Sequence, residues 1–120
     1  THTVFSLEGG AAAAGRLITR GATAVICGSD LMALGAIRQA RSMGLNVPGE
    51  VSVVGYDDSA IMAFTDPPLT TIRQSVEAMG DAAVRALLEE ITGESTPRAE
   101  YVFRPELVVR GSTGAAPHRG

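Results

Sequence analysis

One stretch, residues 24–58, constrains the fold of this chain more than any other. Residues 24–27 and 51–54 form two short apolar runs, each typical of a strand buried inside a sheet. Between them, residues 31–43 carry apolar side chains at helical spacing, and Gly44 supplies a helix stop. A strand, helix and strand of this length predict a right-handed unit with parallel strands.

Acidic and hydroxyl side chains follow both predicted strands. Ser29 and Asp30 come after the first strand, and Asp57 and Asp58 come after the second. Since parallel strands finish at one edge, and open α/β sheets bind ligands there, the pattern predicts a binding site. We expect Asp57 to accept hydrogen bonds from ligand hydroxyl or N–H groups, whereas Ser29 and Asp30 alone would be an ordinary helix start.

The composition argues against several kinds of chemistry. The chain has 120 residues, a net charge of −3 and ten basic residues, all of them Arg. The absence of Lys excludes Schiff-base catalysis and the lysine of a P-loop. The net negative charge gives no electrostatic indication that this chain binds nucleic acid. No catalytic triad, metal-ligand set or acid–base pair can be assembled, so we expect a binding protein without catalysis, metal or cofactor.

The single cysteine and the hydropathy pattern bear on the compartment. Cys27 has no partner for a disulfide within the chain, which favours a reducing environment, and it is expected to pack as a small buried hydrophobe. There is no signal-peptide pattern and no apolar run long enough to span a bilayer. We therefore expect a soluble, cytoplasmic chain.

The remaining sequence predicts short elements and a flexible end. In order, these are a helix at 11–19, a short helix or turn at 59–64, a strand at 69–72, a helix at 75–92 capped by Ser75, a polar loop at 94–98, an interrupted strand at 101–110, and a flexible tail at 111–120. The first convincing element is a helix, and only two strands look fully buried. The fold class is thus α/β with a parallel sheet, and the chain reads as part of a domain.

Three motifs resemble the LacI/GalR family of bacterial transcription regulators. They are Cys27-Gly-Ser-Asp-Leu-Met-Ala-Leu-Gly-Ala36, Val47-Pro-Gly-Glu-Val-Ser-Val-Val-Gly-Tyr-Asp-Asp58 and Pro67-Pro-Leu-Thr-Thr-Ile-Arg-Gln74. The match extends over nearly the whole chain. It implies that residues 1–110 are the carboxyl-terminal part of an effector-binding domain, a three-layer α/β/α lobe like those of periplasmic binding proteins, with helix 75–92 belonging to the other lobe.

The resemblance also implies roles for individual residues. It assigns Asp57 to the effector, with Ser29 where an Asn is more usual, Phe5 as a stacking aromatic, and Val76 and Met79 as contacts from the other lobe. Asp30 and Asp58 are expected to be structural. The surfaces that resemble the family's dimer interface contain Leu31, Leu34, Arg38, Ile61 and Phe64.

The function implied is the sensing of a small effector, a sugar or a purine-like molecule, by a dimer that controls operator DNA through a DNA-binding domain outside this chain. The apolar stripe on helix 75–92 predicts that the chain is at least dimeric, with this helix packed or exchanged between subunits. A periplasmic sugar-binding protein of a transporter is the alternative in the same fold. A small flavodoxin-like enzyme is a third reading, for which no catalytic base is found.

Overall fold

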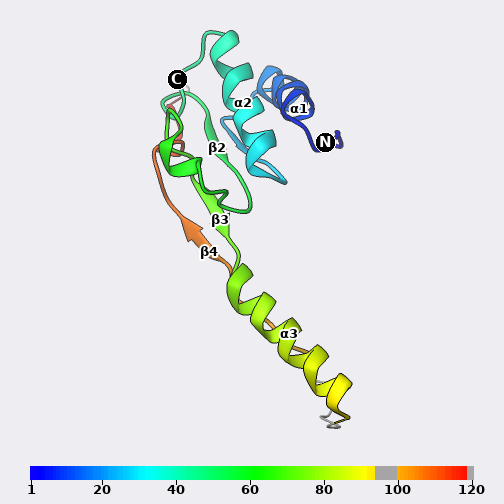
Figure 1. Cartoon of the computed structure of the whole chain (residues 1–120). Coiled ribbons are helices and arrows are strands. Elements are labelled where there is room, and N and C mark those ends of the chain that lie inside the picture. Colours follow the sequence, from blue (N-terminus) through cyan, green and yellow to red (C-terminus); the bar gives the residue numbers. More distant parts are fainter. Residues whose placement is uncertain (94–99, 119–120) are drawn as a thin grey trace. The chain divides into compact units, whose positions relative to one another are not determined.

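The computed structural model describes residues 1–93 and 100–118, and these residues form two compact units. Unit 1 contains residues 1–73 and 107–118 of the described chain, and unit 2 contains the described residues between 74 and 106. The polar loop predicted at 94–98 lies outside the described residues. Figure 1 traces the order of the elements along the chain.

Unit 1 is built on the predicted strand–helix–strand arrangement. Strand β1 (Ala24–Ile26), helix α2 (Asp30–Ser42) and strand β2 (Ser52–Val54) follow one another, and β1 pairs with β2 in parallel, with Val25 opposite Val53. Beyond β2, single parallel bridges join Val54 to Thr70 and Asp57 to Arg73. The sequence prediction of a parallel unit is therefore confirmed.

Helix α1 begins earlier than the sequence indicated. It runs over Leu7–Thr19, because the hydroxyl of Ser6 accepts a hydrogen bond from the N–H of Gly9 at 2.9 Å and caps the first turn. Helices α1 and α2 cross with glycines at the contact. A Cβ on Gly10 would meet the backbone of Met32, and one on Gly35 would meet the carbonyl oxygen of Leu7. Only glycine permits the two backbones to approach this closely.

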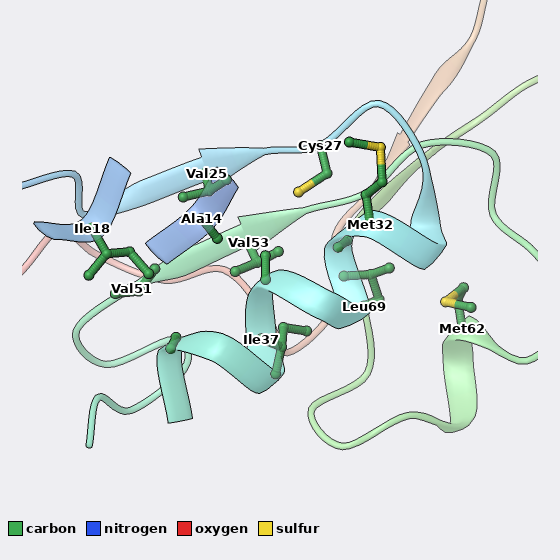
Figure 2. Close-up of a cluster of buried hydrophobic side chains, with 13 residues drawn as sticks. Ala14, Ile18, Val25, Cys27, Met32, Ile37, Val51, Val53, Met62 and Leu69 are labelled. Carbon is green, nitrogen blue, oxygen red and sulfur yellow. The ribbon is translucent and has the colours of Figure 1, made fainter. Parts of the chain in front are cut away.

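The core of unit 1 is aliphatic and lies between these two helices and the strands (Figure 2). Ala14 and Ile18 come from α1, Val25 from β1, Cys27 from the residue after β1, and Val53 from β2. Ala33, Ala36 and Ala40 of α2 have no exposed surface, so the sequence's many small residues allow tight packing.

The expectation that both strands are buried on two faces holds for β2, where Ser52 and Val53 are both buried, but not for β1. Val25 of β1 is buried, but Ala24 is exposed and Ile26 is 80% exposed. Parallel sheets normally carry helices on both faces, and α1 and α2 both pack on one. Within the described residues, the lobe is thus a fragment of a three-layer fold.

The remaining elements of the chain are short, apart from one long helix. They are the 3₁₀ helix η1 (Met62–Phe64), strand β3 (Thr71–Arg73), helix α3 (Val76–Thr92) and strand β4 (Glu106–Val108), which pairs with β3. Ser75 precedes α3, but its side chain makes no capping hydrogen bond, so the predicted cap is wrong. Gly93 ends α3 at a φ of 75°, as a helix-terminating glycine does.

The tail predicted at 111–120 is wrong at its start, where the chain is anchored to the sheet. The hydroxyl of Ser112 donates to the carbonyl oxygen of Val53 at 2.6 Å and accepts from the N–H of Thr70 at 2.8 Å. Gly114 bonds to the hydroxyl of Ser52 at 3.1 Å. Composition alone suggested fraying, but these side-chain bonds add to a backbone bond in which the N–H of Val53 donates to the carbonyl oxygen of Ser112 at 2.9 Å.

Candidate functional site

The carboxyl ends of β1 and β2 meet at one edge, as the parallel pairing requires. The N–H of Cys27 donates to the carbonyl oxygen of Val54 at 2.9 Å, and the N–H of Asp30 donates to that of Tyr56 at 3.0 Å. These two bonds hold the turn that contains Ser29 beside the segment that leads to Asp57. The edge predicted from the sequence is therefore formed.

Asp57 presents an exposed carboxylate at this edge from a fixed backbone. Its N–H donates to the carbonyl oxygen of Ile72 at 2.9 Å, and its φ is 116°. Asp58 follows with a φ of 58°. Positive φ is uncommon outside glycine and costs roughly 1–3 kcal/mol per residue, and such strained positions cluster at ligand sites.

Ser29 and Phe5 lie at the end of β1. The Ser29 hydroxyl accepts the N–H of Met32 at 3.2 Å as the cap of α2, which leaves its own O–H free to donate. The ring of Phe5 lies over Gly28, since a Cβ at that glycine would be 3.0 Å from Phe5 Cζ. Phe5 is nevertheless 74% exposed, so a face of the ring is open to a ligand.

Val76 and Met79 lie in unit 2, on the first turn of α3, and both are exposed. Their assignment to the effector stays a prediction. The same holds for the interface residues, all in unit 1: Leu31, Arg38, Ile61 and Phe64 are exposed, and Leu34 is partly buried.

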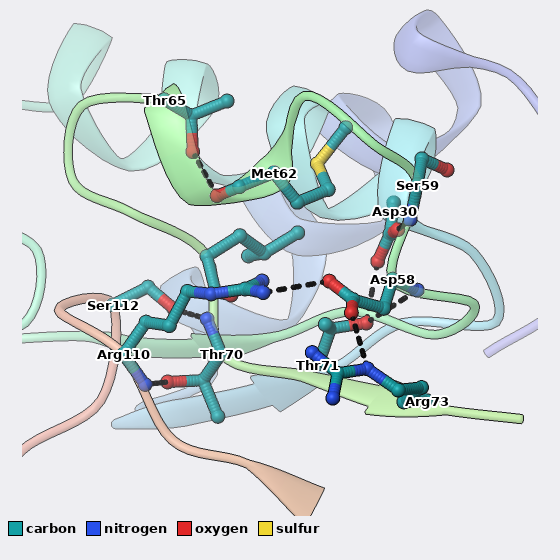
Figure 3. Close-up of polar contacts among 11 residues, drawn as sticks. Asp30, Asp58, Ser59, Met62, Thr65, Thr70, Thr71, Arg73, Arg110 and Ser112 are labelled. Carbon is teal, nitrogen blue, oxygen red and sulfur yellow. Dashed lines mark hydrogen bonds and ion pairs between the residues drawn. The ribbon is translucent and has the colours of Figure 1, made fainter.

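Asp30 is structural, as expected. Asp30 is only 2% exposed. Its carboxylate accepts hydrogen bonds from the hydroxyl of Thr71 at 2.6 Å and from the N–H of Ser59 at 2.7 Å (Figure 3). It thereby joins the start of α2 to β3 and to the loop after β2. Asp30 thus also holds the N–H that begins the 59–64 segment.

Asp58 is paired with two arginines that sequence reasoning did not connect to it. Its Oδ2 accepts Arg73 Nε at 2.8 Å, and its Oδ1 lies 2.8 Å from Arg110 Nη2. Burial opposes ionisation of Asp58, but the hydrogen bonds and charges of Arg73 and Arg110 outweigh it and hold its pKa below the ordinary value. The only sequence signal was an Arg at the end of each predicted strand, 69–72 and 101–110.

Cys27 behaves as the sequence predicted. It is buried in the core, and burial raises the pKa of its thiol to about 11. A thiol with such a pKa stays protonated at neutral pH and is a poor nucleophile. In residues 1–93 and 100–118, no three His, Cys, Asp or Glu side chains gather to hold a metal ion.

Taken together, unit 1 is an α/β lobe whose parallel strands end beside two exposed side chains, Asp57 and Phe5. Residues 2–113 match the family described as periplasmic binding protein-like domain. The chain belongs to that family and is a fragment of the effector-binding domain found in LacI/GalR-type transcription regulators.

The relatives found are regulators. The chain is 66% identical over 116 residues to the HTH-type transcriptional regulator MalR of Streptomyces coelicolor, covering 97% of this chain and 34% of MalR. It is 41% identical to the HTH-type transcriptional repressor CytR of Escherichia coli, covering 94% of this chain and 34% of CytR. The chain thus spans about a third of the length of these relatives.

Solved structures of regulators share the fold. The transcriptional regulator CelR in complex with cellobiose matches with a TM-score of 0.85 and 40% identity, over 93% of this chain and 35% of CelR. The lac repressor dimer bound to operator and the anti-inducer ONPF matches with a TM-score of 0.84 and 34% identity, over 94% of this chain and 40% of the repressor.

No helix in the described parts of the chain has the length and apolar character to cross a membrane.

Proposed function

We propose that this chain is the sugar-sensing part of a cytoplasmic, DNA-binding transcription regulator. The observation that carries the proposal is the exposed Asp57 carboxylate at the carboxyl edge of the sheet, next in sequence to the partly buried, ion-paired Asp58. A carboxylate can accept two hydroxyl groups of a sugar at once, and an exposed aromatic such as Phe5 can cover the apolar face of its ring.

A sugar is favoured over a purine-like effector by the ligands of two related structures. CelR is described in complex with cellobiose, and a LacI-family regulator of Enterococcus faecium, 30% identical to this chain, is described with bound ribose. Ser29, Val76 and Met79 would complete the contacts of the effector. Ser29 would act as a hydrogen-bond donor, and the two side chains on α3 as apolar cover.

The effector would act by shifting the population of the regulator between two conformations. A sugar that binds one arrangement of the regulator more tightly than another biases the protein toward it, and the attached DNA-binding part responds. This acidic chain, without Lys, would not bind operator DNA by itself.

We further infer that the regulator forms a homodimer through the surface of Leu31, Leu34, Arg38, Ile61 and Phe64. We also infer that it has no enzymatic turnover.

The alternative of a transporter's sugar-binding protein is not favoured, because MalR and CytR are named as transcriptional regulators. The same names count against the flavodoxin-like enzyme, since transcriptional regulators are not enzymes.

The test is calorimetry on the full-length regulator with cellobiose and D-ribose, the sugars of the two related structures. Asp57→Asn exchanges one carboxylate acceptor for a donor, so affinity for the bound sugar should fall by about tenfold or more. Glu50→Gln is the matched control, because it neutralises an exposed carboxylate before β2, at the opposite end of that strand. Equal affinities for wild type and Asp57→Asn would refute the role of Asp57.

A further inference from the structure

The two residues at the candidate site with positive φ need something to hold them. Asp57 and Asp58, at 116° and 58°, are the non-glycine residues with positive φ in the described chain. Such backbone conformations persist only where surrounding contacts fix them. The contacts made by Asp58 are therefore relevant to where the Asp57 carboxylate points.

Asp58 is held from three sides. Its carboxylate pairs with Arg73 and Arg110, each at 2.8 Å, and its N–H donates to the Thr71 hydroxyl at 3.3 Å (Figure 3). The side chains of Asp58 and Arg110 are only 11% and 15% exposed, whereas Arg73 is 51% exposed. The Arg110 pair is thus shielded from solvent and should outweigh an ordinary surface ion pair.

Arg110 is itself fixed by two further bonds. Its Nη1 donates to the carbonyl oxygen of Leu69 at 3.0 Å, and its backbone N–H donates to the Thr70 hydroxyl at 2.9 Å. The guanidinium therefore joins Asp58 to the segment that leads into β3. A planar fork with several donors can hold both partners at once, which an ammonium cannot do with the same geometry.

Both arginines lie close to the points where the chain passes between the two units. Arg73 is the last residue of unit 1 before the chain enters unit 2, and Arg110 follows the return of the chain to unit 1 at Leu107. Asp58 thus pairs with both segments that connect the units, directly beside Asp57 in sequence.

We propose that Arg110, acting through Asp58, is a positioning residue that orients the Asp57 carboxylate toward the effector and links it to both connecting segments. This inference rests on the proposed sugar-binding role of Asp57. Arg110 does not touch the effector in this scheme. It holds Asp58, Asp58 fixes the strained backbone at 57–58, and that backbone sets the direction of the Asp57 side chain.

The experiment is a double-mutant cycle on the full-length regulator, with cellobiose and D-ribose as probes in calorimetry. Arg110→Gln should lower affinity about tenfold in the wild-type background and cause no further loss in the Asp57→Asn background, because its effect passes through Asp57. Arg110→Lys should restore only part of the affinity. Arg41→Gln, at an exposed arginine of α2, is the matched control and should change nothing.

The outcomes separate the two proposals. An equal loss from Arg110→Gln in both backgrounds, or no loss in either, would overturn the positioning role alone. Equal affinity of wild type and Asp57→Asn, or no binding of either sugar by folded wild type, would overturn the proposed function and the inference together. Should Arg110→Gln not fold, the cycle is run with Arg110→Lys, which keeps the positive charge but not the planar fork, and the same outcomes decide.

Discussion

The hydroxyl of Thr71 donates to the buried carboxylate of Asp30 across 2.6 Å, and this bond joins β3 to the start of α2. Thr71 has no exposed surface, and Asp30 is 2% exposed. The loss of a hydrogen-bond donor to a buried charge cannot be compensated by water.

Thr71→Val should therefore destabilise the protein while keeping the side chain's shape. Hydrogen bonds to charged groups contribute about 1.5–3 kcal/mol, and we expect a loss of that size in the free energy of unfolding measured in urea. Thr19→Val is the control, because the Thr19 hydroxyl donates only to Gly15 of its own exposed helix face. Equal effects of the two substitutions would contradict the importance of the Asp30 bond.

The ion pairs of Asp58 predict a specific dependence of stability on pH. Since its pKa in the folded chain is lowered, Asp58 contributes stability that is present above the unfolded pKa of about 3.9 and is lost as pH falls through the folded pKa. Asp58→Asn should remove that part of the pH dependence below about pH 4. Thermal melting of both proteins between neutral and acidic pH measures it, and parallel curves would count against the pairing.

The glycine contact between α1 and α2 predicts a steric effect. Gly35→Ala would drive a methyl group into the carbonyl oxygen of Leu7, so the helices must separate and the alanine-lined core must loosen. Overpacking of this kind costs about 1–3 kcal/mol. Gly15→Ala, whose methyl would meet only the Gln39 side chain at 3.3 Å, should be tolerated. Denaturant unfolding of the two variants provides the comparison.

Cys27 should resist alkylation in the folded protein. With its thiol pKa raised to about 11 and its side chain in the core, little thiolate is present or accessible at pH 8. Iodoacetamide labelling followed by mass spectrometry should be slow in buffer and fast in urea. Rapid labelling of the native protein would mean that β1 opens readily.

The proposed dimer surface can be tested by placing a charge on it. Phe64 is 86% exposed and Ile61, three residues earlier, is 63% exposed, and grouped exposed apolar side chains mark interaction surfaces. Phe64→Glu in the full-length regulator should shift the sedimentation profile toward monomer, whereas Val109→Glu, an exposed apolar residue outside that surface, should not. An unchanged profile for Phe64→Glu would place the interface elsewhere.

The local sequence pattern determined the arrangement of residues 24–58. Strand periodicity, helix spacing and the glycine stop are short-range signals, so β1, α2 and β2 and their parallel pairing follow without knowledge of the rest of the chain. The edge that carries Ser29 and Asp57 follows as well, because parallel strands must end on the same side. Two of the three family motifs, residues 27–36 and 47–58, lie in the same stretch.

Only the tertiary structure decided what joins distant segments. The bonds of Asp58 to Arg73 and Arg110, the anchoring of Ser112 to Val53, and the exposure of Ile26 depend on which strands become neighbours and in what register. The sequence pattern of one segment does not encode its neighbour's register, since many pairings bury the same apolar residues. Side-chain chemistry selects among those pairings only when the folded backbone brings donors and acceptors within bonding distance.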